Sequence, residues 1–383
     1  MKSIFYTEDH ELFRETLQDF FKKEVIPFLD HWEKEEKVDR SIIKKMGDMG
    51  YLALEVDEQY GGLGLDYMYS AILNEEMGKL GTLGFGTTVS VHAYLAMNYL
   101  SHGGSDFLKQ KYLLPSAKGE IVGSLGMTEP FAGSDLKAIR TNAVLDGNEY
   151  VINGSKTFIS NAFYGDYCVV AAKTDNGISM IVVDLDSEGV TKNKLNKVGL
   201  KSSDTAELGF NNVRVPKENL IGLEGTGFYY MMESLQVERL TLAQANIGLM
   251  QHVLDITLQY ISERNAFGQS INNFQVLRHT IAEMASDIEA WKLFTEHTSY
   301  RLSKGEHVVK ECSMLKLKTS DLVNDIVYKC LQMFGGYGFI EDYPIARIYR
   351  DVRVQPIYGG TSEIMKEIIA KIVIEQKTYS TSY

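Results

Sequence analysis

The chain has 383 residues, of which 44% are hydrophobic, so it is too long for one compact core and fits two or three packed units. Its 39 basic and 51 acidic residues give a formal net charge of -12, and no run of Lys and Arg is long enough to follow a phosphate backbone. Nucleic acid is therefore excluded as an expected partner, whereas a polyphosphate held locally by backbone N–H groups and one or two Arg side chains is not.

The first third of the chain is predicted to be helical. From Glu8 to about Ile26, apolar residues recur at helical spacing, and similar patterns occupy roughly residues 40–50, 66–80, 86–102 and 105–114. From about residue 121 the pattern changes to short β-branched or aromatic runs, namely IVGSLGM, TNAV, EYVING, YCVVAAK, ISMIVVD and AELGFNNVRV. Turn pairs such as Asp146-Gly147 and Asn153-Gly154 separate these runs, which predict a compact antiparallel β-domain.

Helical periods return from Gly227 onward, near residues 227–263, 272–303, 307–334 and 361–376, and their Ala, Ile, Leu and Met content favours helix-on-helix packing. We therefore expect an α+β protein of three consecutive domains: an N-terminal helical domain (1–119), a β-domain (120–226) and a C-terminal helical bundle (227–383). Only six prolines and no Gly/Ser-rich linker predict that these domains are in tight contact.

The cysteines and the N-terminus indicate the compartment. Cys168, Cys312 and Cys330 are too few and too scattered for a disulfide framework, and no CxxC pair predicts a metal site. The N-terminus has early acidic residues and no apolar signal core, and nowhere do 18 apolar residues run together. We expect a cytoplasmic protein with no metal and no membrane span, or a mitochondrial one only if a transit peptide is missing from this sequence.

Residues 125–135, LGMTEPFAGSD, form a loop of small and hydroxyl-bearing residues after the first predicted strand. Thr128, Ser134 and the N–H groups around Gly133 can donate to a ring carbonyl or a phosphate, because glycine lets the backbone approach closely. Gly-Ser-Asp is also ordinary turn chemistry, so the loop by itself leaves a plain turn open.

Five motifs in order resemble the acyl-CoA dehydrogenase family: LGMTEPFAGSD, KTFISNA (156–162), ERNAFGQ (263–269), QMFGGYGF (332–339) and RVQPIYGGTSE (353–363). The resemblance runs from about Thr7 to Ala370. It implies FAD as the cofactor and the family fold, in which an N-terminal helical domain, a central antiparallel β-barrel-like domain and a C-terminal four-helix bundle follow one another. No GxGxxG follows a predicted strand and no GxxxxGK[ST] occurs, so a doubly wound nucleotide fold is not expected.

The resemblance also assigns the FAD contacts. Phe158 stands where many members have Trp, and Ser160 where many have Thr. The subunit's own FAD would be held by Leu125, Met127, Thr128, Gly133, Ser134, Phe158, Ile159, Ser160, Thr361 and Glu363. The FAD of a neighbouring subunit would meet Arg264, Phe267, Gln275, Gln332, Gly335 and Gly336. Shared FAD sites imply an oligomer, commonly a homotetramer.

The catalytic base is the point at which this chain departs from most members, because Gly359 stands where they carry a glutamate. Removing an α-proton from a thioester needs a carboxylate with a raised pKa near the α-carbon. Glu238 lies on a predicted helix, shares its face with apolar residues such as Leu235 and Leu242, and has no cation three or four positions away. Burial on such a face raises the pKa of an acid.

From the residues alone, Glu238 could instead reach an Arg or Lys on another helix or extend to solvent. The other acidic candidates are Glu129, for which we expect a structural role, and Asp351 and Glu363, which we expect to pair with Arg or to contact FAD. The sequence VERLTLA is similar to the isovaleryl and long-chain members, which place the base on this helix and lack the loop glutamate. The resemblance therefore implies Glu238 as the base.

The implied reaction removes the pro-R α-proton to Glu238 while a hydride passes from the β-carbon to flavin N5, which gives a trans-2-enoyl thioester. A backbone N–H near Gly359 and the flavin's ribityl hydroxyl would stabilise charge on the thioester oxygen. Substrate contacts are implied for Ser134, Tyr229, Gln236, Arg239, Gly359 and Gly360, although Gln236 replaces an acidic residue seen in several members. The electrons would pass to electron-transfer flavoprotein, as in fatty-acid β-oxidation.

Two alternatives stay open. Same-fold oxidases and flavin monooxygenases return the electrons to oxygen, and a flavin-fold protein without catalysis would act as an assembly partner. The length or branching of the acyl group, and whether CoA or a carrier protein bears it, are also open.

Overall fold

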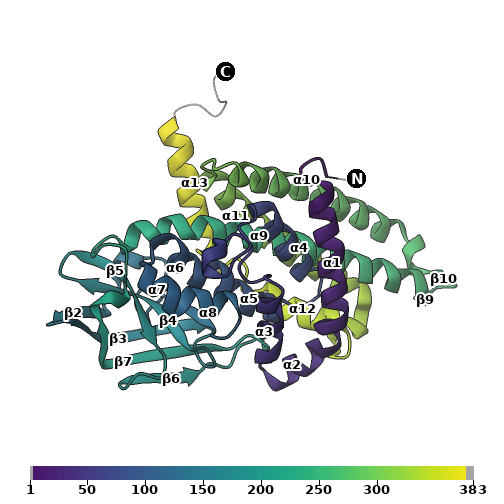
Figure 1. Cartoon of the computed structure of the whole chain (residues 1–383). Helices are drawn as coiled ribbons and strands as arrows, with labels where there is room; N and C mark the ends of the chain where they lie inside the picture. The colour runs from purple at the N-terminus through teal and green to yellow at the C-terminus, as the bar shows by residue number, and fades with distance from the viewer. Residues whose placement is uncertain (1–2, 377–383) are drawn as a thin grey trace. The chain divides into compact units, whose positions relative to one another are not determined.

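The computed structural model describes residues 3–376 (Figure 1). Its contacts group the chain into two compact units, each of which is assembled from separate segments. The bundle unit contains the residues up to Ile26, residues 67–86 and the chain from Arg239 onward. The sheet unit contains residues 27–66 and 87–238. The long helix α9 (Gly227–Glu263) has residues in both.

The sheet unit contains most of the strands. They are β1 (Gly123–Gly126), β2 (Asn142–Asp146), β3 (Glu149–Ser160), β4 (Tyr167–Thr174), β5 (Gly177–Asp184), β6 (Val190–Lys194), β7 (Thr205–Pro216) and β8 (Leu220–Ile221). Its helical segments are α2 (Leu29–Glu35), α3 (Arg40–Asp48), the π-helix η3 (Val91–Ala96), α6 (Met97–Gly103), α7 (Asp106–Leu108), the π-helix η4 (Lys109–Leu113) and α8 (Leu114–Ala117). Helix α5 (Leu83–Ser90) precedes η3 and begins in the other unit.

The strands pair in the order β6-β7-β3-β2-β4-β5-β8, and β1 joins β4. Pairing is mostly antiparallel, but β1 runs parallel to β4, and β2 meets β4 in parallel at Asn142 and Lys173. The two end strands of this order, β6 and β8, are not paired with each other in the described chain, so the sheet is open. The predicted α+β class is confirmed, and the predicted barrel-like domain is an open, mixed sheet.

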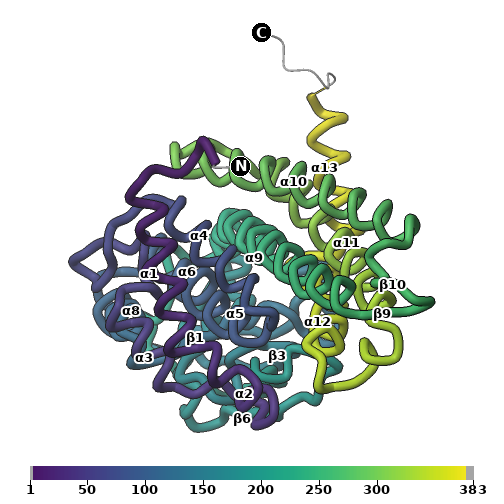
Figure 2. Tube along the Cα trace, turned by 90° about the vertical axis from the view of Figure 1, so that its right-hand side faces the viewer, coloured from purple at the N-terminus to yellow at the C-terminus, as the bar shows by residue number. Residues whose placement is uncertain are grey.

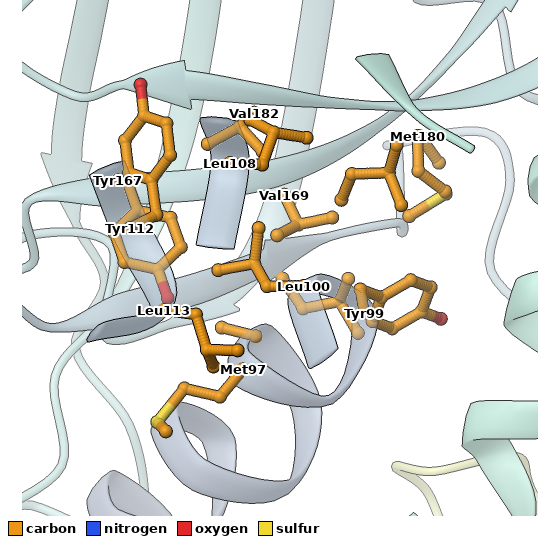
Figure 3. Packing of buried hydrophobic residues seen from close by; sticks show 14 of the residues in the cluster. Met97, Tyr99, Leu100, Leu108, Tyr112, Leu113, Tyr167, Val169, Met180 and Val182 are labelled. Atoms are coloured by element: carbon orange, nitrogen blue, oxygen red, sulfur yellow. The ribbon is translucent and has the colours of Figure 1, made fainter. Parts of the chain in front are cut away.

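Alternation along β4 explains how both faces of the sheet become buried. Val169 and Ala171 point into a cluster with residues of α6 and η4, whereas Cys168 and Val170 point into a second cluster with β3 and β7. Successive strand residues face opposite sides, so a strand buried on both faces reads as a continuous apolar run such as YCVVAAK. Figure 3 shows the first cluster, in which the rings of Tyr112 and Tyr167 lie close together.

The two predicted turn pairs have different outcomes. Gly147 has φ 66° and turns the chain between β2 and β3, as predicted. Asn153-Gly154 is not a turn, because it lies inside β3 at a register shift of the β3–β7 ladder. Gly154 has φ 148°, and a Cβ there would come within 2.5 Å of Thr141 Oγ1. A bulge explains the glycine at this position better than a hairpin turn does.

The bundle unit contains the remaining helices (Figure 2). They are α1 (Glu8–Glu24), α4 (Tyr67–Gly78), the later part of α9, α10 (Gln275–Ser303), α11 (Val309–Phe334), α12 (Pro344–Val352) and α13 (Ser362–Gln376), with a short hairpin of β9 (Asn265–Ala266) and β10 (Gln269–Ser270) after α9. Helix α11 packs against α10, α12 and α13, and α4 packs against α1 and α10. The bundle therefore includes two helices from the N-terminal part of the sequence.

Helices α4 and α9 approach each other backbone to backbone. A Cβ on Gly78 would lie 2.1 Å from the Ala245 carbonyl oxygen, and one on Gly248 would lie 1.9 Å from that of Glu75. Only glycine permits such an approach. Within residues 3–376, the helices all fall short of the length and apolar content that a membrane crossing requires.

Candidate active site

The loop that follows β1 is fixed by a buried ion pair. Lys156, which is fully buried on β3, places its Nζ 2.7 Å from Glu129 Oε1 and 3.0 Å from the Met127 carbonyl oxygen. The backbone N–H groups of Arg140 and Thr141 donate to the same carboxylate at 2.6 and 3.0 Å. Burial alone would raise the pKa of Glu129, but these donors hold it below its ordinary value. Glu129 is thus structural, as expected, and unsuited to accept a proton.

The loop presents its small polar groups to solvent. Thr128 is tied by its carbonyl oxygen to the Thr157 N–H at 2.9 Å, and a bridge between Glu129 and Ala132 closes a tight turn. Gly133 and Ser134 are exposed beyond that turn, and a Cβ on Gly133 would meet nothing within 4 Å. The loop is held rigidly at Glu129 and exposes the hydrogen-bond donors of Gly133 and Ser134, so it can bind a ligand.

Phe158 is the strained residue of this site. It has φ 61°, a conformation that bulky side chains rarely adopt, and it lies where the β3–β7 register shifts between Lys156 and Ile159. Its ring is 70% exposed within the described chain. Strain of this kind is commonly kept where it aims a side chain at a ligand.

The other residues predicted to hold the flavin from β1 and β3 are either buried or accessible. Ile159 and Leu125 are buried in the two sheet clusters, so only their backbone can reach a ligand, whereas Ser160 and Met127 are partly exposed. After β3, Asn161 has φ 61° and its Nδ2 donates to the Thr88 carbonyl oxygen at 2.8 Å. The same Nδ2 lies 3.4 Å from the carbonyl oxygen of Gly123, so Asn161 holds the end of β3 beside the start of β1.

Glu238 is half buried on α9. One turn before it, the Ser234 side chain hydrogen-bonds to the hydroxyl of the buried Tyr99, which also donates to Met127 Sδ at 3.9 Å. Burial raises the pKa of Tyr99, and the nearby charge of Glu238 raises it further. Figure 3 shows the Tyr99 hydroxyl pointing away from the apolar cluster. Within the sheet unit, Tyr99 thus contacts the loop after β1 at Met127 and lies close enough to Glu238 to be affected by its charge.

Two of the predicted substrate residues, Tyr229 and Gln236, lie before Glu238 on α9. Tyr229 is exposed and its hydroxyl bonds to the carboxylate of Glu233, and Gln236 is partly exposed. Both are accessible to a ligand, and neither is close-packed in the core.

In the bundle unit, the predicted substrate turn lies between α12 and α13. Gly359 and Gly360 have φ 62° and 95°, values that favour glycine. Lys316 on α11, fully buried, donates its Nζ to the Gly360 carbonyl oxygen. Arg239 is also buried, and its Nη2 is 3.8 Å from where a Cβ on Gly360 would stand. Two buried cations thus border the turn.

The first turn of α13 holds Thr361 and Glu363. Thr361 Oγ1 accepts from the Ile364 N–H at 3.3 Å, so it caps the helix. Hydrogen bonds from the backbone N–H of Glu363 and from the Thr361 side chain lower the pKa of Glu363, which is exposed. A carboxylate that stays ionised is a poor base. Asp351 is excluded differently: it is buried, and its Oδ2 accepts from the Leu83 N–H at 3.3 Å.

Only some of the residues predicted to contact the FAD of a neighbouring subunit line the same pocket. An open pocket of about 420 Å³ is lined by Tyr260, Arg264, Ile271, Met333, Phe334, Gly335, Gly336, Tyr337 and Ile340. It includes three of the predicted residues, Arg264, Gly335 and Gly336, and the Arg264 guanidinium lies 5.7 Å from the centre of the Tyr337 ring. Phe267, Gln275 and Gln332 are exposed outside this lining, and Phe267 has φ 53° at the tip of the β9–β10 hairpin.

Each unit separately has features that fit part of a flavin dinucleotide. An exposed aromatic ring at Phe158 and the open Ser134 suit a planar heteroaromatic ring. A capped helix N-terminus at Thr361 and an exposed Arg beside two glycines suit phosphates and an adenine. A Cβ on Gly335 or Gly336 would meet nothing within 4 Å, so the pocket is open at that point.

Sequence reasoning missed three residues that organise the site: Lys156, Tyr99 and Lys316. Each makes its contact with residues at least 27 positions away. Local spacing carries no signal for such contacts. The only hint is a lysine inside an apolar pattern, as in MLKLK (314–318), which would ordinarily be interpreted as a side chain extending to solvent.

Comparison with known proteins agrees with this geometry. Family models match along the chain: the acyl-CoA dehydrogenase N-terminal domain over residues 7–120, the middle domain over 124–213 and the C-terminal domain over 225–374. The long-chain specific acyl-CoA dehydrogenase of Sus scrofa is 39% identical over 97% of this chain and 88% of its own length. The short-chain specific enzyme of Clostridium acetobutylicum is 36% identical over 95% and 97%.

Solved structures agree as well. An acyl-CoA dehydrogenase from Geobacillus kaustophilus superposes with a TM-score of 0.94 at 41% identity, covering 97% of this chain and all of the other. A glutaryl-CoA dehydrogenase from Mycobacterium smegmatis in complex with FADH2 superposes with a TM-score of 0.92 at 26% identity, covering 98% and 97%. The chain therefore belongs to the acyl-CoA dehydrogenase family, whose enzymes are FAD-dependent oxidoreductases that dehydrogenate acyl-CoA.

Proposed function

We propose that this enzyme forms a trans-2-enoyl-CoA from a saturated acyl-CoA with Glu238 as the base. The observation that carries the assignment is the pair of Glu238, half buried beside the buried Tyr99, and Gly359, whose turn offers no carboxylate. The other acidic candidates are each engaged elsewhere or held ionised: Glu129 by Lys156, Asp351 by the Leu83 N–H, and Glu363 at the start of α13.

Glu238 removes the α-proton, since its carboxylate is partly screened from water and has the buried hydroxyl of Tyr99 nearby. When FAD is bound, it supplies the acceptor for the hydride from the β-carbon. A base in a partly desolvated site is stronger than one in water, which helps it to deprotonate a weak carbon acid.

The turn at Gly359 supports the thioester. A backbone N–H there donates to the carbonyl oxygen as charge develops on it, and the buried cations Lys316 and Arg239 add positive potential beside Gly360. Ser134, Tyr229 and Gln236 are accessible for contacts with the CoA portion. Phe158 would present its exposed ring to a bound flavin, which Ser160 and Thr128 would help to hold in place.

The enzyme works as a homotetramer and passes its electrons to electron-transfer flavoprotein. The exposed apolar side chains Phe267 and Phe339 of the bundle unit support an oligomer, because burying both rings against another subunit would remove apolar surface from water. Relatives with long-chain and short-chain names match this chain at similar identity, so acyl length is left to measurement.

The test is a panel of straight and branched acyl-CoAs added without oxygen to the FAD-loaded protein, with bleaching of the main visible flavin band as the signal. Bleaching by at least one chain length supports the proposal. FAD that stays oxidised with every thioester would favour a non-catalytic assembly protein. Rapid return of the colour in air, without electron-transfer flavoprotein, would favour an oxidase.

A further inference from the structure

Lys316 is one of the largest fully buried side chains of the described residues, and the reaction proposed above gives it no role beyond adding positive potential. It lies on α11, and its Nζ donates to the carbonyl oxygen of Gly360, 44 positions further along the chain. Burying an ammonium group is costly, so a methionine of similar length would serve better if filling space were the only requirement.

Helix α11 also contacts both ends of the connection between α12 and α13. Asn324 Nδ2 donates to the Val352 carbonyl oxygen at 2.8 Å, where α12 ends, and Ser362 Oγ donates to Asp321 Oδ1 at 3.2 Å, where α13 begins. Lys316 fixes the middle of the same connection. The two glycines of the turn have wide conformational freedom, so the turn depends on such anchors for a single shape.

The direction of this bond decides where the next donor points. The peptide bonds of residues 3–376 are all trans, and in a trans peptide the carbonyl and the N–H point in opposite directions. With the Gly360 carbonyl turned toward Lys316, the Thr361 N–H is turned away from α11. The cation also polarises this peptide, which makes that N–H a stronger donor.

We propose that Lys316 is a positioning residue for the dehydrogenation proposed above, on which this inference rests. It acts through the Gly360–Thr361 peptide, holding the Gly359–Gly360 turn in the one shape that receives the thioester and aiming the Thr361 N–H at the cofactor. The ligand chemistry it serves is a thioester oxygen that gains negative charge and a flavin.

The experiment compares Lys316→Met and Lys316→Arg with Lys318→Met in the FAD-loaded enzyme. Lys318 is exposed two positions further along α11 and is the matched control. Three quantities are measured: the rate of anaerobic flavin reduction at saturating acyl-CoA, the KM, and the dissociation constant of FAD by titration of the FAD-free protein.

We expect Lys316→Met to reduce flavin about tenfold to a hundredfold more slowly, the loss usual for a misaligned oxyanion donor, with KM changed by less than about threefold and FAD bound more weakly. Lys316→Arg keeps a cationic donor and should recover part of the rate. Equal rates and equal FAD affinity for Lys316→Met and Lys318→Met would overturn the proposal, even if Lys316→Met melts at a lower temperature.

Two further outcomes are separated by design. If Lys316→Met does not fold, Lys316→Gln replaces it, and a Gln variant with the wild-type rate and FAD affinity overturns the proposal. If the wild type and Lys318→Met are themselves not reduced by any acyl-CoA, the proposed function has failed. FAD affinity then decides the positioning role alone: a weaker affinity in Lys316→Met supports it, and an unchanged affinity overturns it.

Discussion

Lowering the pH should destabilise this protein in part through the buried His92. Its ring is fully buried; Nδ1 accepts from the Gly123 N–H at 3.0 Å, and Nε2 lies 3.1 Å from the Ser116 carbonyl oxygen. Only the neutral ring with its proton on Nε2 satisfies both bonds, because a carbonyl cannot donate. Burial lowers the pKa of His92 from 6.5 to about 4.

The direction and the size of the change in folding stability with pH follow from this pKa. The folded protein binds the proton more weakly than the unfolded chain, so the stabilisation is complete above about pH 6.5 and is lost as the pH falls toward 4. A tenfold change in proton affinity is worth about 1.4 kcal/mol, so the loss is about 2 kcal/mol at pH 5 and about 3 kcal/mol when complete. A proton on Nδ1 also removes the acceptor for the Gly123 N–H and places two donors against each other. Gly123 is the first residue of β1, the strand that leads into the loop after it.

The assay is urea unfolding of the wild type, His92→Asn and His102→Gln at pH 7.5 and pH 5, at one protein concentration. His102 is exposed on the neighbouring helix and serves as the control. Burial also lowers the pKa of His252, so the total pH dependence is not specific to one residue. The difference between wild type and His92→Asn should shrink by about 2 kcal/mol at pH 5, whereas that for His102→Gln should not change. A difference for His92→Asn that stays constant would refute a buried neutral ring.

Three other experiments test how the site is built. Phe158→Gly should lower the unfolding free energy of the FAD-free protein, measured in urea, by less than about 0.5 kcal/mol, because glycine relieves about 1 kcal/mol of strain at φ 61°. The same variant should bind FAD more weakly. A large loss of stability would mean that the ring is a core residue. Gly360→Ala should lower the unfolding free energy by about 1–2 kcal/mol, since its φ is 95° and its Cβ would lie 2.7 Å from Met365 Cε, whereas Gly133→Ala should change it by less than about 0.5 kcal/mol; equal melting temperatures would contradict the turn geometry. Lys156→Met should cost about 3–5 kcal/mol by leaving Glu129 buried without its cation, and adding Glu129→Gln should recover part of that loss in the same unfolding assay; no recovery would mean that the ion pair is not the cause.

Much of the fold was predictable because its strongest elements have unbroken patterns. The predicted bounds of α9 match the structure at Gly227 and Glu263, and α10 and α11 differ only by a few residues at their starts. The short α12, with Arg347, Arg350 and Asp351 among its nine residues, was not predicted, because two turns give little periodicity. β6, which is polar and only partly buried, carried no strand pattern either.

The candidate site was predictable where chemistry is local in sequence. The loop at 125–135, the position of Phe158 and the pair of Glu238 and Gly359 follow from motifs. The grouping of α1 and α4 with the C-terminal helices was not predictable, because it depends on backbone contact at Gly78 and Gly248. The supporting contacts of Lys156, Tyr99 and Lys316 were missed for the same reason: tertiary packing decides whether a polar side chain is buried, and spacing along the chain does not.

The central claim, that Glu238 takes the α-proton because Gly359 cannot, is tested most directly by anaerobic flavin reduction in Glu238→Gln. Asp255→Asn, an exposed acid on the same helix, is the control. With the best substrate of the panel, we expect Glu238→Gln to bind FAD and acyl-CoA normally but to reduce flavin at least about a thousandfold more slowly, while Asp255→Asn keeps the wild-type rate. Reduction of flavin in Glu238→Gln at a rate near that of Asp255→Asn would contradict the claim.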